Sequence, residues 1–315
     1  MASKSLSTNR SKESIQGIWY SILAFVAWGF LPLYWKALKE VQPEEILAHR
    51  IVWSLVFVAV ILVLNGRWKQ LRKVLRQPRK LLAILVCSLL IGVNWFIYIW
   101  AVNANHVVEA SLGYYINPLL SVFLGMIVLK ERLSCWQLVS LFLACLGVII
   151  ITLHYGSIPW IALSLAITFG LYGLFKKMAN VDSLISLALE TAVLAPVALG
   201  YLLFLQVKGS AALGSVTIST TMLLIGSGVA TALPLLWFAM GTQRVALSTV
   251  GFIQYLAPSI SLMLGIFVFK ESFTSTDALS FGFIWSALVV YTFSKSGFLM
   301  RMQPFKYNIE NTEGR

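Results

Sequence analysis

The sequence predicts an all-α integral membrane protein with ten transmembrane helices, arranged as two inverted repeats of five helices each. Three observations carry this prediction. Of the 315 residues, 59% are hydrophobic and only 11% are charged, whereas a soluble chain carries about 25% charged residues. The apolar residues gather into runs long enough to cross a bilayer. The second half of the chain also repeats residues of the first half at a nearly constant offset.

The apolar runs follow one another with short polar segments between them. Inside a bilayer the backbone must satisfy its own hydrogen bonds, so runs of this length predict helices. Barrel strands would be shorter and would alternate polar with apolar residues. We expect helices at about residues 17–38, 44–64, 81–101, 111–129, 135–153, 158–175, 184–205, 219–240, 247–269 and 278–294.

Positive charge predicts the orientation of these helices. The chain has 24 Lys and Arg against 12 Asp and Glu, a net charge of +12. With the N-terminus in the cytoplasm, 19 of the cations fall in cytoplasmic segments and four in outer ones. The segment 65–80 alone has seven cations and no acid, and we interpret it as a cytoplasmic loop. We expect cytoplasmic tails at 1–16 and 295–315.

The internal repeat is clearest where residues 115–131 align with residues 255–271 at an offset of 140 and share eight identities. The two repeats then span residues 17–153 and 158–294. Five is an odd number of spans, so the second repeat must enter the membrane from the opposite side. Inverted repeats of this kind place a solute site between the halves and permit alternating access, which favours a transporter. We interpret the Lys-Glu pair that ends each aligned segment as an interfacial anchor.

Polar side chains inside apolar spans mark the candidate site, because they are costly in lipid. Arg50 and Glu190 occupy equivalent positions at an offset of 140. We expect both to face the space between the halves, where a direct pair is marginal and a water- or solute-bridged pair is plausible. Snorkelling of Arg50 to the outer surface is the alternative. Glu190 is either a proton-exchanging group or an ionised anchor, and we favour the anchor.

Two prolines inside spans, Pro118 and Pro258, each free the carbonyl four residues earlier, at Tyr114 and Gln254. Aromatic side chains lie near these points, and a cavity lined by them favours a flat organic solute over a bare ion. The predicted translocation path comprises His49, Arg50, Trp95, Tyr98, Tyr114, Asn117, Pro118, Glu190, Gln254, Tyr255 and Pro258.

Motifs for other chemistry are missing from the sequence. It has no phosphate-binding P-loop, no zinc-protease motif and no nucleophile elbow. The three cysteines lie in apolar runs without metal-ligand spacing. His106 and Glu109 could face one way on a helical turn, but they lie in a short outer loop and we do not expect them to bind a metal. We expect no cofactor, metal or catalytic residue, no ATPase domain in the chain and no nucleic-acid partner. The expected partners are the lipid bilayer and a small organic solute. The oligomeric state is open, a homodimer included.

Four contiguous strings are distinctive: EILAHRIVWS at 45–54, NWFIYIWAVN at 94–103, HVVEASLGYYINPL at 106–119 and QYLAP at 254–258. They closely resemble the RarD proteins of the EamA branch of the drug/metabolite transporter superfamily. The resemblance extends from about residue 17 to 295. It implies two EamA units in a bacterial cytoplasmic membrane and transport of metabolites or drug-like molecules without ATP hydrolysis.

Two other classes of function compete with a transporter. A membrane-embedded enzyme acting on a lipid would need a cluster of His, Asp or Glu at one membrane face, and only His106 and Glu109 come near one. An accessory subunit of a membrane complex would have a large apolar surface for its partner and no cavity of solute size.

Overall fold

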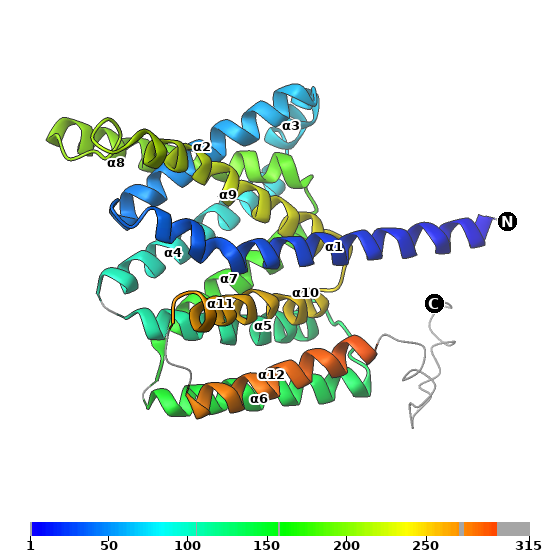
Figure 1. Ribbon diagram of the computed structural model, residues 1–315. Helices are drawn as coiled ribbons and strands as arrows, with labels where there is room; N and C mark the ends of the chain where they lie inside the picture. Colours follow the sequence, from blue (N-terminus) through cyan, green and yellow to red (C-terminus); the bar gives the residue numbers. More distant parts are fainter. Residues whose placement is uncertain (1, 105, 157, 271–273, 295–315) are drawn as a thin grey trace.

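The computed structural model describes residues 2–104, 106–156, 158–270 and 274–294, and these residues form helices joined by short loops (Figure 1). Ten of the helical segments are long and apolar enough to cross a membrane, which confirms the predicted number. The helices are α1 Ala2–Ala37, α2 Pro43–Leu64, α3 Trp68–Leu75, α4 Pro78–Asn103, α5 Val107–Ile127, α6 Cys135–Tyr155, α7 Trp160–Ala179, α8 Ser183–Lys208, α9 Ile218–Arg244, α10 Leu247–Gln254, α11 Leu256–Phe267 and α12 Ser275–Ser294.

Local sequence signals begin and end these helices. α2 begins with a proline at its first position, where a missing N–H costs nothing. α8 begins after Asp182, whose carboxylate accepts hydrogen bonds from the N–H groups of Leu184 and Ile185. It ends at Gly209, which adopts the left-handed conformation that a glycine tolerates. These signals limit α8 to a length suited to one crossing of the membrane.

Three element boundaries differ from the sequence prediction. α1 continues back to Ala2, because residues 2–16 contain neither glycine nor proline to stop it. The basic segment 65–80 is not all loop, since it holds the short helix α3. α7 runs on to Ala179 and includes Lys176 and Lys177, which we had placed in a loop.

The ninth span, Leu247–Phe267, is one apolar run but two helices. The α-helical pattern breaks between Gln254 and Leu256, three residues before Pro258. A proline lacks the N–H that the helix would use at that turn, and its ring crowds the preceding turn. α5 passes through Pro118 without such a break, so equivalent prolines have different effects in the two halves.

The helices pack in a pattern that mixes the two halves of the chain. α5 lies against α10, and α6 lies against α12 (Figure 1). α2 packs between α8 and α9. The contact with α9 is a close backbone approach: a side chain added at Gly228 would meet the carbonyl carbon of Trp53 at 2.3 Å. Helix approach of this kind requires a glycine.

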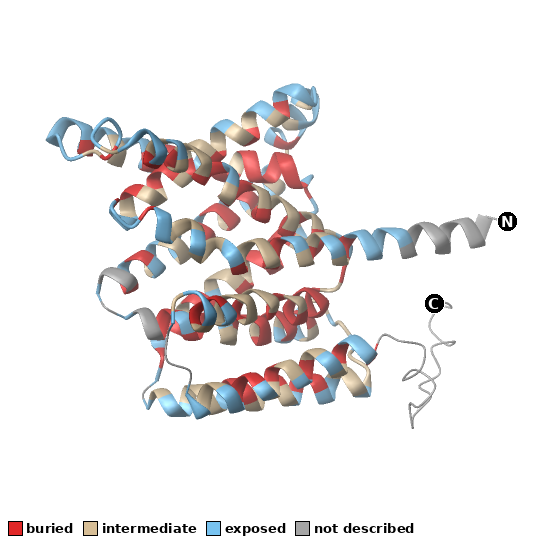
Figure 2. Ribbon diagram, in the orientation of Figure 1, coloured by how far each residue is buried: buried red, intermediate tan, exposed pale blue. Residues whose placement is uncertain are grey.

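Buried residues lie along the middle of the bundle, while exposed ones cover α3 and the far end of α8 (Figure 2). The largest buried cluster joins α1, α2, α4, α7, α8 and α9. The first residues of α1, the last residues of α12 and the whole of α3 lie on one side of the bundle (Figure 1). An even number of crossings produces this arrangement, and we refer to this side as the basic end.

Candidate functional site

Arg50 lies inside the bundle and does not snorkel to the outer surface. Its Nε donates a hydrogen bond to Oγ1 of Thr231 on α9, at 2.9 Å. Its guanidinium carbon lies 4.5 Å from the ring centroid of Trp35 and 5.4 Å from that of Trp95. The side chain on α2 therefore contacts α1, α4 and α9, and these contacts join the two halves of the chain.

Two tyrosines extend this group of rings. The phenols of Tyr98 on α4 and Tyr114 on α5 lie within electrostatic range of the Arg50 guanidinium. Their ring centroids are 6.2 Å apart in an edge-to-face arrangement. Half of the surface of Tyr114 is exposed, and Tyr98 is exposed over about a third of its surface. We call Arg50, Trp35, Trp95, Tyr98, Tyr114 and Thr231 the Arg50 site.

The charge of Arg50 is only partly compensated by the protein. A central arginine costs about 3 kcal/mol on insertion scales, and contacts with aromatic rings return part of this cost. No carboxylate of the described residues forms an ion pair with Arg50. The Arg50 site therefore keeps a positive charge that no ion pair of the described residues neutralises.

Glu190 is not part of this site, contrary to the expectation that it shares a space with Arg50. Its carboxylate is buried and accepts hydrogen bonds from Nζ of Lys176 at 2.5 Å, from Ser186 at 2.6 Å and from Tyr172 at 3.1 Å. All of these partners lie on α7 and α8. The ion pair explains why α7 continues beyond residue 175: Lys176 is buried in the helix because Glu190 neutralises it.

The residues around the two prolines form a separate group where α5 meets α10. Ser121 donates a hydrogen bond to Oε1 of Gln254 at 3.3 Å. Tyr255 donates one to the carbonyl of Tyr115 at 3.4 Å. A side chain added at Gly251 would meet the carbonyl oxygen of Pro118 at 2.7 Å, so the two backbones touch.

Most members of this second group are hidden. Asn117, Pro118, Gln254, Tyr255 and Pro258 are all buried. The Oδ1 atom of Asn117 has no hydrogen-bond partner among the described residues. Pro118, Gln254 and Tyr255 thus belong to the contact between the halves, whereas the rings of Tyr98 and Tyr114 are exposed.

His49 is buried next to Arg50 in sequence but makes different contacts. Neither of its ring nitrogens has a hydrogen-bond partner among the described residues. Its Nε2 lies 3.9 Å from Oε1 of Glu45, one turn earlier on α2. That carboxylate oxygen accepts a hydrogen bond from the N–H of Ala212 at 2.6 Å, and it thereby ties α2 to the segment before α9.

Two other carboxylates hold the starts of helices. Glu131 accepts hydrogen bonds from the N–H groups of Leu247 and Ser248 at 2.7 and 2.8 Å. It is thus a cap for α10 and not the interfacial anchor that we expected. Glu109 accepts a bond from the N–H of Ile161 at 2.7 Å, near the start of α7. Both arrangements satisfy N–H groups that a helix start leaves free.

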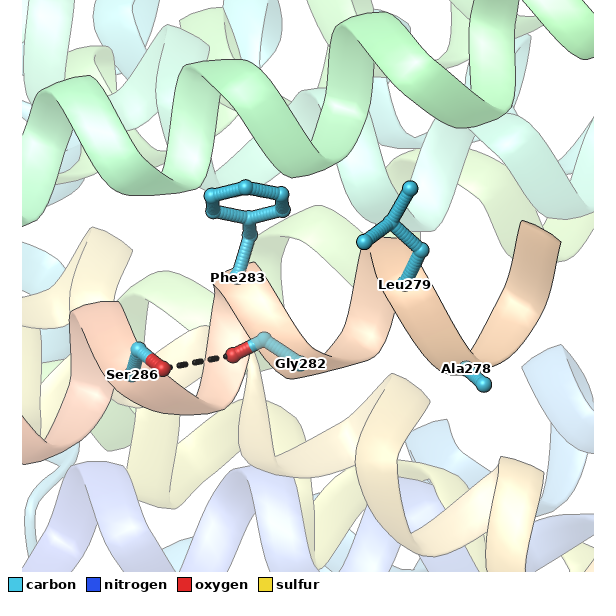
Figure 3. A pocket seen from close by; sticks show the side chains of 5 residues that line it. All are labelled: Ala278, Leu279, Gly282, Phe283 and Ser286. Carbon is cyan, nitrogen blue, oxygen red and sulfur yellow. Dashed lines mark hydrogen bonds between the residues drawn. The ribbon is translucent and has the colours of Figure 1, made fainter. Parts of the chain in front are cut away.

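A shallow hollow on α12 is distinct from the Arg50 site. Ala278, Leu279, Gly282, Phe283 and Ser286 line it (Figure 3). The hydroxyl of Ser286 donates to the carbonyl of Gly282 at 2.7 Å, so it is already used within the helix. The remaining lining is apolar, as expected for the outer face of a membrane helix.

Sequence reasoning missed three members of these clusters. Trp35 lies near the end of its apolar run, where aromatic residues are common, and Thr231 carries no charge that would single it out. Lys176 was assigned to a loop because a lysine usually ends an apolar run. The repeat offered one signal that Trp35 and Lys176 have related places in the fold: the two positions are equivalent at an offset of 141.

The comparisons with known proteins agree on one family. The EamA-like transporter family matches residues 15–153. The uncharacterized transporter YojE of Bacillus subtilis is 49% identical over 90% of this chain and 95% of its own. Protein RarD of Streptomyces exfoliatus is 45% identical over 89% of both chains. Protein RarD of Escherichia coli is 38% identical over 89% of this chain and 95% of its own.

The chain belongs to the RarD proteins of the EamA family. A solved crystal structure with 20% sequence identity superposes on it with a TM-score of 0.69, covering 92% of this chain and 98% of the other. At that identity the likeness concerns the fold alone. The relatives named as transporters and the ten apolar helices make this RarD-family protein a multi-pass membrane protein of the transporter class.

Proposed function

We propose that this RarD-family protein is a secondary transporter of small organic solutes that works by alternating access between residues 17–153 and 158–294. The observation that carries the proposal is the Arg50 site. A charged side chain lies inside the bundle, among rings from three helices of the first half and a hydroxyl from the second. A solute bound there would contact both halves, so movement of one half against the other would change the access to it.

The proposed inverted symmetry has support in contacts between equivalent residues. A twofold axis brings equivalent positions together only where they lie close to it. The rings of Trp28 and Phe169, related by an offset of 141, lie 5.7 Å apart. Tyr115 and Tyr255, related by an offset of 140, share a hydrogen bond. The helix pairs α5 with α10 and α6 with α12 are likewise equivalents in contact.

The predicted path residues take different roles in this proposal. Arg50, Trp95, Tyr98 and Tyr114 contact the solute. Asn117, Pro118, Gln254, Tyr255 and Pro258 form the contact that changes as the halves move, because a proline and a helix break weaken the backbone bonds that resist bending. His49, the residue before Arg50 on α2, lies toward Glu45 and has no contact with the solute in this proposal. Glu190 keeps α7 and α8 together.

The location of the protein is part of the same proposal. Its basic end faces the cytoplasm, with both termini on that side of the bacterial inner membrane, as the charge bias favours. The chain carries no ATP-binding motif of the P-loop type, so solute gradients or ions drive the movement. No catalytic step is involved.

Counterflow in liposomes tests the proposal. The purified full chain is reconstituted with an internal pool of one solute, and entry of the labelled solute is followed for panels of acidic, neutral and basic organic molecules. We expect labelled solute to accumulate transiently for at least one class, without ATP. Folded protein that moves no member of the panels would contradict a transporter and favour an accessory subunit. Recovery of a chemically altered lipid would favour an enzyme.

A further inference from the structure

We propose that the Arg50 site recognises an organic anion: a carboxylate binds the guanidinium, and a flat apolar body lies against the surrounding rings. This inference rests on the proposed function, because it names the class of solute that the transporter would carry.

The hydrogen-bond donors of Arg50 give the first argument. A guanidinium has five N–H donors in a planar fork. Nε uses its N–H on Thr231. The other donors, on the two terminal nitrogens, make no hydrogen bond within the described residues, and Arg50 is only partly buried. Two such nitrogens side by side match the two oxygens of a carboxylate.

The balance of charge gives the second argument. An arginine remains ionised under all ordinary conditions. The acid at the equivalent position in the second half, Glu190, is neutralised by Lys176 at 2.5 Å. The nearest acid on α2, Glu45, accepts a backbone hydrogen bond from Ala212. The site thus lacks one negative charge, and a bound anion supplies it, while a cationic solute is repelled.

The rings give the third argument and define the rest of the solute. Trp35 and Trp95 flank the guanidinium at 4.5 and 5.4 Å and limit its movement. Tyr98 and Tyr114 add two more rings at an edge-to-face distance of 6.2 Å. Walls of this kind bind flat, apolar groups through their faces and edges. A small inorganic anion would not contact these four aromatic rings. The favoured solute therefore carries a carboxylate on an aromatic or similarly flat group.

Matched pairs of an acid and its amide test this inference, because they differ in charge and hardly in shape. The probes are benzoate and benzamide, phenylacetate and phenylacetamide, and indole-3-acetate and indole-3-acetamide. Binding to the purified full chain in detergent is measured by titration calorimetry. We expect at least one acid to bind about 10-fold or more tighter than its amide, as for a hydrogen bond between charged groups.

Substitutions then assign the preference to Arg50. Arg50→Gln should make the acid and the amide bind equally well, and Arg50→Lys should keep part of the preference but lose the fork geometry. Arg132→Gln removes the same charge from an exposed position between α5 and α6, and it should keep the full preference. If Arg50→Gln does not fold, the acid and amide affinities of the wild type and of Arg50→Lys show whether Arg50 causes the acid preference.

Several results would overturn the inference. One is a wild-type protein that binds none of the acids, or that binds each amide as tightly as its acid. Another is a full acid preference in folded Arg50→Gln. Phenyl phosphate binding about 10-fold tighter than phenylacetate would replace the carboxylate with a phosphate ester. Failure of the two proposals is distinguishable: acid preference without counterflow contradicts transport alone, and counterflow of neutral solutes without acid preference contradicts the anion site alone.

Discussion

At the scale of single residues, equivalent positions in the two halves carry different chemistry. Positions 35 and 50 of the first half correspond to positions 176 and 190 of the second. In the first half, the Arg50 guanidinium lies over the ring of Trp35 at 4.5 Å. In the second half, the Lys176 ammonium binds the Glu190 carboxylate at 2.5 Å. One position therefore carries a charge without an ion-pair partner among the described residues, while the charges at the other neutralise each other.

The buried ion pair leads to a prediction about stability. Lys176→Met or Glu190→Gln alone should lower the free energy of unfolding by about 3–5 kcal/mol, because one buried charge loses its partner. The double variant Lys176→Met with Glu190→Leu should recover most of that loss. The midpoint temperature of unfolding in detergent, followed by size-exclusion chromatography, measures both effects.

An exposed ion pair provides the control. Arg67 and Asp182 are 2.5 Å apart, but both side chains are well exposed, so Arg67→Ala should cost no more than about 1 kcal/mol. Single variants of Lys176 and Glu190 as stable as the wild type would contradict the structural role. A stable double variant that no longer transports solute would instead show that Glu190 acts in transport.

Single residues could be predicted from the sequence where a charge or an aromatic ring stood out in an apolar run, as at Trp95, Tyr98 and Tyr114. Arg50 and Glu190 were found in this way, because lipid penalises an ionised group. Lys176 was not found, since a lysine near the end of a span looks the same whether it meets solvent or a buried acid. Which ring lies over Arg50 depends on packing between α1 and α2, and that packing leaves no mark in a single sequence.

At the scale of helices, close backbone contact places the Arg50 site. α2 touches α9 at Gly228, where an added side chain would lie 2.3 Å from the Trp53 carbonyl carbon. One residue after Trp53, the hydroxyl of Ser54 donates to the carbonyl of Gly228 at 2.9 Å. This contact sets the distance between α2 and α9, and therefore between Arg50 and Thr231.

Glycine substitutions provide a test of this contact. Gly228→Ala should force α2 and α9 apart, lower the unfolding midpoint and weaken solute binding at the Arg50 site. Gly200→Ala is the matched control, because Gly200 lies inside α8 with no atom within 4 Å of the added carbon. It should keep or raise stability by about 0.5–1 kcal/mol through its better helix propensity. Equal stability of the two variants, measured by thermal unfolding, would contradict the close-packing account.

The number of spans was predictable because hydropathy measures the dominant free energy of a membrane helix. Their exact ends were not, since helices continue past the hydrocarbon region wherever nothing breaks them, as α1 does to Ala2. The break between α10 and α11 had a visible cause in Pro258. α5 continues through Pro118 without a break, so a proline alone does not determine whether a helix is interrupted.

At the scale of the whole molecule, two halves interlock so that each membrane-crossing segment of one half meets helices of the other. The contacts of α2 with α8 and α9, and of α5 with α10, leave neither half with a core of its own. Movement between the halves must therefore exchange one set of contacts for another. In the proposed alternating access, this exchange changes how a solute reaches Arg50 past the exposed ring of Tyr114.

Labelling of a cysteine at position 114 from each side of the membrane tests this account most directly. In a background in which Cys87, Cys135 and Cys145 are replaced by alanine, Tyr114→Cys is exposed to a membrane-impermeant maleimide in intact cells and in inside-out vesicles. Gln70→Cys, on exposed α3, and Ser210→Cys, after α8, report the cytoplasmic and the outer side. We predict that Gln70→Cys and Ser210→Cys each react from one side only, while Tyr114→Cys reacts from both. Reaction of Tyr114→Cys from a single side, or from neither, would contradict alternating access at the Arg50 site.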